Sequence, residues 1–278
     1  MEFHWGATPE SDAFFERNPK FFDAFERLMV LANKTFGREY QPKDRLQDIA
    51  FNLGETCRMD FFETLFLAVH GWGIGAEKLL RGLYERAVAL AYMIKHPDKA
   101  ERLVRYAAIQ EYKLMLPAVE LFGEKAFDDA MAGNTTVAQI KKFRDLVKSE
   151  FQIPVCKKCH DKGTCQHTAT AFSWDENGVL AQAQDVGEPY TTYYLGGYAQ
   201  PLMHAHVSLT AAMREHDKKP DDERKRRRRH EADAALLHAH ALMLMVIRSQ
   251  NQLFSLGLEQ EIEACEKDMP EVWSLVPE

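Results

Sequence analysis

Residues 76–95 read AEKLLRGLYERAVALAYMIK, and this stretch decides the fold. Its apolar residues recur every three or four positions, which places them in one wide stripe along a helix. The stripe consists of Leu79, Leu80, Leu83, Tyr84, Ala87, Val88, Leu90, Ala91 and Ile94. Pro97 ends the helix, because proline disfavours the helical conformation of the residue before it. A stripe this wide needs burial, so the stretch predicts a central helix packed against several others.

The chain repeats this helical pattern on both sides of the central helix. Pro117 is expected to end one helix, and the glycines of residues 71–75 to separate two others. No strand-like alternation, hairpin signal or internal repeat exceeds the helical pattern. We therefore predict an all-α fold, an irregular helical bundle forming a single domain over residues 1–278, with an inserted cysteine-rich loop at 152–174. Further helices are expected at about 18–37, 44–70, 98–116, 135–151, 179–185 and 222–256, with a tyrosine-rich segment at 189–213 interrupted around Gly196 and Gly197.

The composition is that of an ordinary soluble globular protein, with 46% apolar and 28% charged residues in a chain of 278. A chain of this length can bury a sizeable core. The longest apolar block, Leu236 to Ile247, has twelve residues, which is too short to cross a bilayer. The sequence begins without a basic segment followed by an apolar run, so a secretory signal is not expected. These features predict a cytoplasmic protein with no membrane partner.

Three of the five cysteines fall in the segment 155–167, VCKKCHDKGTCQH. A Cys-x-x-Cys turn presents two thiolates to one ion, and zinc prefers a tetrahedron of sulfur and imidazole ligands. A closed site of four protein ligands normally has a structural role. The spacing therefore predicts a structural zinc cofactor, held by Cys156, Cys159, Cys165 and His167, with His160 as the alternative imidazole.

Three other interpretations of these cysteines stay open. Cys156 to His160 also matches the attachment signature of a c-type haem, which belongs mostly to exported proteins. A redox Cys-x-x-Cys pair normally lies near a strand–helix unit, and none is predicted here. Surface cysteines without any ligand are the third interpretation. We favour zinc, because clustered cysteines in a cytoplasmic chain indicate metal binding more than structural disulfides.

Arg224 to Arg229 is a run of six basic residues in a chain whose formal net charge is −7. Between Arg214 and His230 there are nine Lys or Arg against five Asp or Glu, so this region is locally basic. Such a run can bind the phosphates of a nucleic acid by releasing counter-ions. We favour a solvated helix start neutralised by its acidic neighbours, and keep nucleic acid as the alternative.

Arg81 and Glu85 are four residues apart on the central helix and could simply pair on its surface, which is the interpretation that we favour. If they face the interior instead, the charged pair would be costly and would mark a polar site. His204 is expected at an exposed bend near Tyr193, Tyr194 and Tyr198, after two glycines and a proline. Arg81, Glu85, Tyr194 and His204 are the candidates for a hydrolytic or ligand-binding pocket.

Five short motifs follow one another along the chain, LLRGLYER at 79–86, Cys156-x-x-Cys159, Ser173-Trp174, Tyr190-x-x-x-Tyr194 and His204. In this order they resemble a bacterial domain-of-unknown-function family, whose members have an Arg-x-x-x-Glu helix early and a Tyr…His segment late. The resemblance spans roughly residues 81–256. It implies an all-α fold and draws attention to Arg81, Glu85, Tyr194 and His204, without supplying a reaction. Departures from the family pattern at His160 and in the spacing after His167 leave the metal ligands open.

Arg224 and His230 also fit the Arg-x(4–6)-His spacing of the HEPN-type helical ribonucleases, which this arrangement distantly resembles. Those enzymes cut RNA without metal at a dimer interface, so the resemblance implies a homo-oligomer. In their mechanism His230 would act as general base or acid, and Arg224 would stabilise the charge on the phosphorane.

The leading hypothesis is a cytoplasmic helical protein whose zinc-ordered loop is structural and whose bundle binds a partner or a nucleic acid. The alternatives are the ribonuclease and the pocket around Arg81, Glu85, Tyr194 and His204. The sequence does not decide whether the protein is an enzyme.

Overall fold

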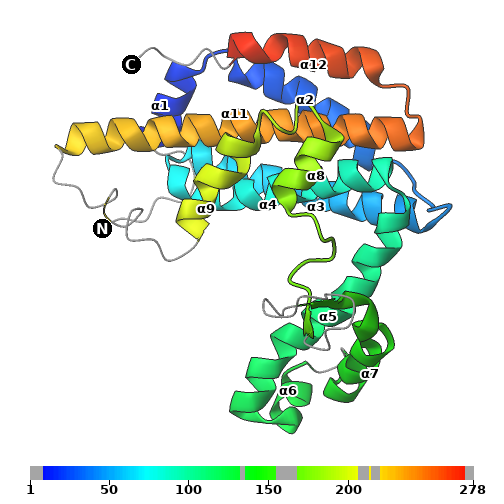
Figure 1. The fold of residues 1–278 in the computed structure, drawn as a ribbon. Helices are drawn as coiled ribbons and strands as arrows, with labels where there is room; N and C mark the ends of the chain where they lie inside the picture. Colours follow the sequence, from blue (N-terminus) through cyan, green and yellow to red (C-terminus); the bar gives the residue numbers. More distant parts are fainter. Residues whose placement is uncertain (1–8, 132–134, 155–167, 206–212, 214–219, 273–278) are drawn as a thin grey trace. The chain divides into compact units, whose positions relative to one another are not determined.

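The computed structural model describes residues 9–131, 135–154, 168–205, 213 and 220–272 (Figure 1). Helices dominate these residues, which include one pair of three-residue strands, so the all-α class is confirmed. Contacts group the chain into two compact units, unit 1 with residues 1–95 and 179–278, and unit 2 with residues 96–178. Each unit buries apolar clusters of its own. The single domain stays a prediction.

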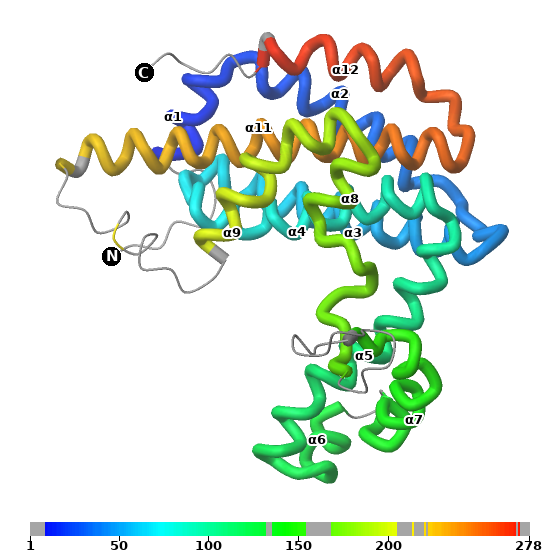
Figure 2. The backbone as a smooth tube through the Cα atoms, viewed as in Figure 1, coloured from blue at the N-terminus to red at the C-terminus, as the bar shows by residue number. Residues whose placement is uncertain are grey.

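Unit 1 is a helical bundle in which three long helices pack against one another, α3, α4 and α11. Helices α2 and α12 lie side by side and both contact α11, while α8, η2 and α9 lie along α4 (Figure 2). The elements of unit 1 are α1 (Pro9–Arg17), α2 (Phe21–Phe36), α3 (Arg45–Val69), α4 (Gly73–Lys95), α8 (Val179–Val186), the π-helix η2 (Leu195–Ala199), α9 (Gln200–Ala205), α11 (Asp221–Phe254) and α12 (Glu259–Val272).

The apolar stripe of α4 forms the centre of this bundle. Leu80, Leu83 and Tyr84 are at most 1% exposed, because they pack into the cluster shared with α3 and α11. The helix begins at Gly73, inside the glycine-rich stretch that we expected to interrupt it. A Cβ on Gly73 would lie 2.7 Å from the backbone nitrogen of Ala232. The glycine therefore lets the start of α4 approach the backbone of α11 closely.

Unit 2 is a smaller helical unit with two apolar clusters. Tyr106 and Ile109 of α5 pack with Phe151 in one of them. Asp175 has a fully buried carboxylate, and Lys99 of α5 pairs with it at 2.7 Å, which ties the chain after the strands to this helix. The elements of unit 2 are α5 (Asp98–Phe122), α6 (Glu124–Ala130), α7 (Val137–Val147), the 3-10 helix η1 (Lys148–Phe151), β1 (Gln152–Pro154) and β2 (Thr168–Thr170).

The end of α5 and the strand pair of unit 2 differ from what the sequence predicts. Helix α5 continues through Pro117 to Phe122 rather than ending before the proline. Met115 is buried with α7, and Val119 packs against the same cluster, so tertiary contacts hold this part of the helix together. Strands β1 and β2 form an antiparallel pair that was not expected, since three-residue strands contain too little alternation to be recognised.

Candidate functional site

Three charged residues share one face of α4. Glu77, Arg81 and Glu85 follow one another at four-residue spacing, so their side chains lie one above the other. Helix α9 and the π-helix η2 both pack against α4. They place His204 and Tyr198 against this face.

Glu77 and His204 form a buried acid–base pair. Nε2 of His204 lies 3.1 Å from Oε2 of Glu77, and the side chains are 3% and 5% exposed, respectively. A carboxylate is costly to bury unless it is paired, and an imidazole is a suitable partner. In a catalytic triad the carboxylate contacts Nδ1 of the histidine and Nε2 exchanges the proton, whereas Glu77 contacts Nε2 here, so the roles of the two ring nitrogens would be reversed.

Arg81 lies one helical turn after Glu77, a separation of about 6 Å between Cβ atoms. Its Nε donates to Oε1 of Glu85 at 3.0 Å, and its guanidinium carbon is 5.5 Å from the ring centroid of Tyr198. The Arg81 and Glu85 side chains are 25% and 37% exposed. The pair is thus half-buried, between the surface pairing that we favoured and a fully interior charge.

A group of tyrosines lines the next turn of α4. The ring of Tyr198 is 5.3 Å from that of Tyr194 and 5.9 Å from that of Tyr84. The Tyr84 hydroxyl donates to the backbone oxygen of Tyr190 at 2.7 Å. Burial raises the pKa of Tyr198, and the nearby Glu85 carboxylate raises it further. The Tyr198 phenol is therefore neutral at neutral pH, and its oxygen accepts a hydrogen bond from Arg81.

Two glycines position η2 against the rest of unit 1. A Cβ on Gly197 would lie 2.9 Å from Cδ2 of Tyr84, and one on Gly196 would lie 2.1 Å from Nε2 of His238. His238 donates from Nδ1 to the backbone oxygen of Ala234 at 2.6 Å, which fixes its ring. The expected interruption around these glycines is a π-helix, a form that occurs frequently at functional sites.

The four residues chosen from the sequence lie along this one face. Arg81 contacts Glu85, and His204 contacts Glu77 one turn away. Tyr194 reaches the group through Tyr198. Sequence reasoning placed Tyr198 near His204 but missed Glu77 and Tyr84 as members of the group, although Glu77 stands four residues before Arg81 and so lies on the same face. Their grouping as a working site stays a prediction.

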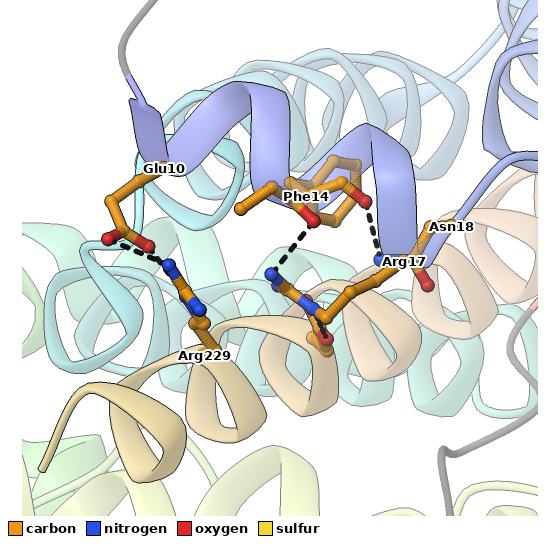
Figure 3. Close-up of polar contacts among 7 residues, drawn as sticks. Glu10, Phe14, Arg17, Asn18 and Arg229 are labelled. Atoms are coloured by element: carbon orange, nitrogen blue, oxygen red, sulfur yellow. Dashed lines mark hydrogen bonds and ion pairs between the residues drawn. The ribbon is translucent and has the colours of Figure 1, made fainter. Parts of the chain in front are cut away.

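The arginine run forms the start of α11, where α1 neutralises part of it (Figure 3). Arg229 donates from Nε and Nη2 to the Glu10 carboxylate at 2.8 and 3.1 Å. Arg227 lies 3.6 Å from the Glu231 carboxylate. Arg224 and His230, six residues apart on a continuous helix, point about 120° away from each other. The Arg224 and His230 side chains of one chain therefore do not point at the same phosphate.

The proposed zinc ligands Cys156, Cys159, Cys165 and His167, and the alternative His160, lie outside the described residues. Within the described part of the chain, no group of three or more His, Cys, Asp or Glu could hold a metal ion. Cys57 and Cys265 are free and buried there, and burial raises the pKa of both thiols.

No helix in the described ranges has both the length and the apolar character needed to span a membrane. Residues 57–224 match the model of a family of unknown function, DUF5677. No curated protein and no solved structure matches the chain. The matched range contains Arg81, Glu85, Tyr194 and His204, and it ends before His230.

Proposed function

This chain belongs to DUF5677, a family of unknown function, and we propose that the α4 face formed by Glu77, Arg81 and Glu85 binds a small anionic molecule and supports its hydrolysis. One observation carries the proposal. The buried contact between Glu77 and His204 lies one helical turn from the cationic side chain of Arg81. A proton acceptor and a positive charge at this separation are what the hydrolysis of an anionic ester needs.

Each side chain has a role in this proposal. Arg81 attracts the anionic group, and its contacts with Glu85 and Tyr198 hold the guanidinium in place. His204 takes a proton from the attacking water, and the Glu77 carboxylate stabilises the imidazolium that results.

Hydrolysis of p-nitrophenyl phosphate and p-nitrophenyl acetate by the purified chain tests the proposal. His204→Gln should lower kcat by about 100-fold or more, the usual contribution of a general base. Arg81→Met should mainly raise KM for the phosphate ester, because the charge that attracts the anion is lost. Lys78→Gln is the matched control, since Lys78 is exposed on the same helix. Full activity of His204→Gln would exclude its role as the base.

The structural zinc loop is a second proposal, supported by the strand pair of unit 2. Pro154 is opposite Thr168 in the antiparallel register, so the residues on either side of segment 155–167 lie next to each other. A metal site that includes both Cys156 and His167 needs its two ends brought together in this way. We expect one zinc per chain, lost in Cys156→Ser and kept in Cys265→Ser. Sub-stoichiometric zinc in the unmodified protein would contradict the proposal.

Binding of a nucleic acid remains a further proposal, supported by the exposure of Lys225, Arg226 and Arg228 at the start of α11. Replacing these three with Gln should weaken RNA binding and flatten its dependence on salt.

The ribonuclease alternative predicts RNA cleavage that His230→Ala abolishes. Sedimentation at several protein concentrations tests whether the chain forms a homo-oligomer. The homo-oligomer and the cytoplasmic location both stay predictions.

A further inference from the structure

Arg38 lies within an aromatic cluster of unit 1, in the loop between α2 and α3. Its guanidinium carbon is 5.4 Å from the ring centroid of Tyr40, 5.2 Å from that of Phe51 and 4.5 Å from that of Phe254. Tyr40 and Phe51 stack with 4.1 Å between their centroids. Rings from the loop, from α3 and from the end of α11 therefore hold the guanidinium in place.

One edge of this guanidinium is buried without a hydrogen-bond acceptor. Nε and Nη2 of Arg38 have no such partner in the structure as described, and neither has the buried phenol oxygen of Tyr40. A buried donor that loses water and gains no acceptor costs about 1–3 kcal/mol, and more when it is charged. Burial accordingly lowers the pKa of Arg38. The cluster thus contains three donor atoms and lacks an acceptor for them.

Other arginines of this protein show what the same edge normally binds. In six of them Nε and Nη2 both donate to one carboxylate, as Arg229 does to Glu10 in Figure 3. A carboxylate fits this edge because its two oxygens match the planar fork of the two N–H groups. The arginines of this kind are Arg17, Arg58, Arg86, Arg105, Arg229 and Arg248.

We propose that the Nε–Nη2 edge of Arg38, together with the Tyr40 hydroxyl, binds the carboxylate of a small organic acid. The edge is buried and its guanidinium lies among three rings, which favours a small free acid over the surface of another protein.

The charges around Tyr40 define which anion fits. The carboxylates of Asp48 and Asp44 raise the pKa of Tyr40 in addition to the effect of burial, and Arg38 lowers it. Asp44 and Asp48 oppose a second negative charge near the phenol, and Arg45, 3.7 Å from the Asp48 carboxylate, offsets part of this effect. The site therefore favours a monocarboxylate over a dianion such as phosphate. It lies outside the matched family range, which begins at residue 57, and it is independent of the site on α4.

Titration of the ¹⁵N-labelled protein with sodium acetate tests this site by the NMR signals of the arginine Nε–H groups. The Arg38 signal, identified by its loss in Arg38→Lys, should shift with acetate and much less with phosphate. The signals of Arg17 and Arg229 should stay in place, because carboxylates of the protein already occupy their edges. Tyr40→Phe keeps the ring and removes the hydroxyl, and we expect it to weaken acetate binding about tenfold, a loss of about 1.4 kcal/mol.

Two results would overturn the proposal. One is an Arg38 signal that acetate leaves unmoved, which would make the cluster a purely structural cation–π contact. The other is an equal shift with sodium chloride, which would show that the guanidinium responds to ionic strength alone. If Arg38→Lys does not fold, the shift that Tyr40→Phe causes in the neighbouring Nε–H signal identifies Arg38 instead.

Discussion

Two glycines in η2 allow neighbouring side chains to come closer than any Cβ would permit. The space at Gly196 is taken by His238, and that at Gly197 by Tyr84. We expect Gly196→Ala and Gly197→Ala each to lower the free energy of unfolding by about 1–3 kcal/mol, the usual cost of an overpacked core. Gly178→Ala is the control, since a Cβ there would meet nothing within 4 Å. Urea unfolding measures the free energy of unfolding of each variant. Equal free energies for Gly196→Ala and Gly178→Ala would contradict the prediction.

We expect His240 to make the stability of the protein depend on pH. It is 2% exposed, and burial lowers its pKa from 6.5 to about 4. Between these values the unfolded chain binds more protons than the folded one, so stability present above pH 6.5 is lost as the pH falls towards 4. The loss should be on the order of 3 kcal/mol over this interval.

Urea unfolding at pH 7 and at pH 5 compares the unmodified protein with His240→Leu. The variant should lose less stability between the two values, because the titrating group is gone. A residual dependence is expected from His238, whose pKa burial also lowers. The same loss in both proteins would show that His240 does not cause it.

At the scale of the elements, the sequence predicts the helices that have a regular apolar pattern. It does not predict features that depend on contacts with other elements. The helix through residues 76–95 followed from its apolar stripe, because burial of one face leaves a regular pattern. The passage of α5 through Pro117 left no such pattern, since contacts from another helix hold it. Arg81 could be chosen for its four-residue spacing from Glu85, and His204 for its place after two glycines and a proline. Glu77 was missed, because the sequence alone does not distinguish a buried carboxylate from an exposed one.

Pro117 lies at an exposed position inside α5 and removes one backbone hydrogen bond of this helix, the one to the carbonyl of Lys113. Pro117→Ala restores the missing N–H donor and removes the clash of the proline ring. We expect it to stabilise unit 2 by about 1–3 kcal/mol. Ala107→Gly, at an exposed position of the same helix, should instead lower stability by about 1 kcal/mol. Hydrogen exchange of the α5 amides measures both, and weaker protection in Pro117→Ala would contradict the prediction.

At the scale of the whole molecule, the two units differ in how the chain builds them. Unit 2 is one continuous segment, residues 96–178, whereas unit 1 joins the segments before and after it. The family match covers residues 57–224, all of unit 2 and parts of unit 1, so its limits do not coincide with those of either unit. A continuous segment with clusters of its own can open while the contacts inside the other unit persist.

Two core substitutions decide whether the units unfold separately or as the single domain that the sequence suggested. Ile109 is 1% exposed in unit 2, and Leu242 is 0% exposed in unit 1. Either residue changed to Ala should lower stability by about 2–5 kcal/mol, through lost burial and the cavity left behind. With separate units, Ile109→Ala lowers the hydrogen-exchange protection of α5 and leaves that of α11 unchanged, while Leu242→Ala does the reverse. A single cooperative domain requires instead that each substitution lowers the protection of both helices by the same amount, because every amide of the slow-exchanging core then opens only through global unfolding.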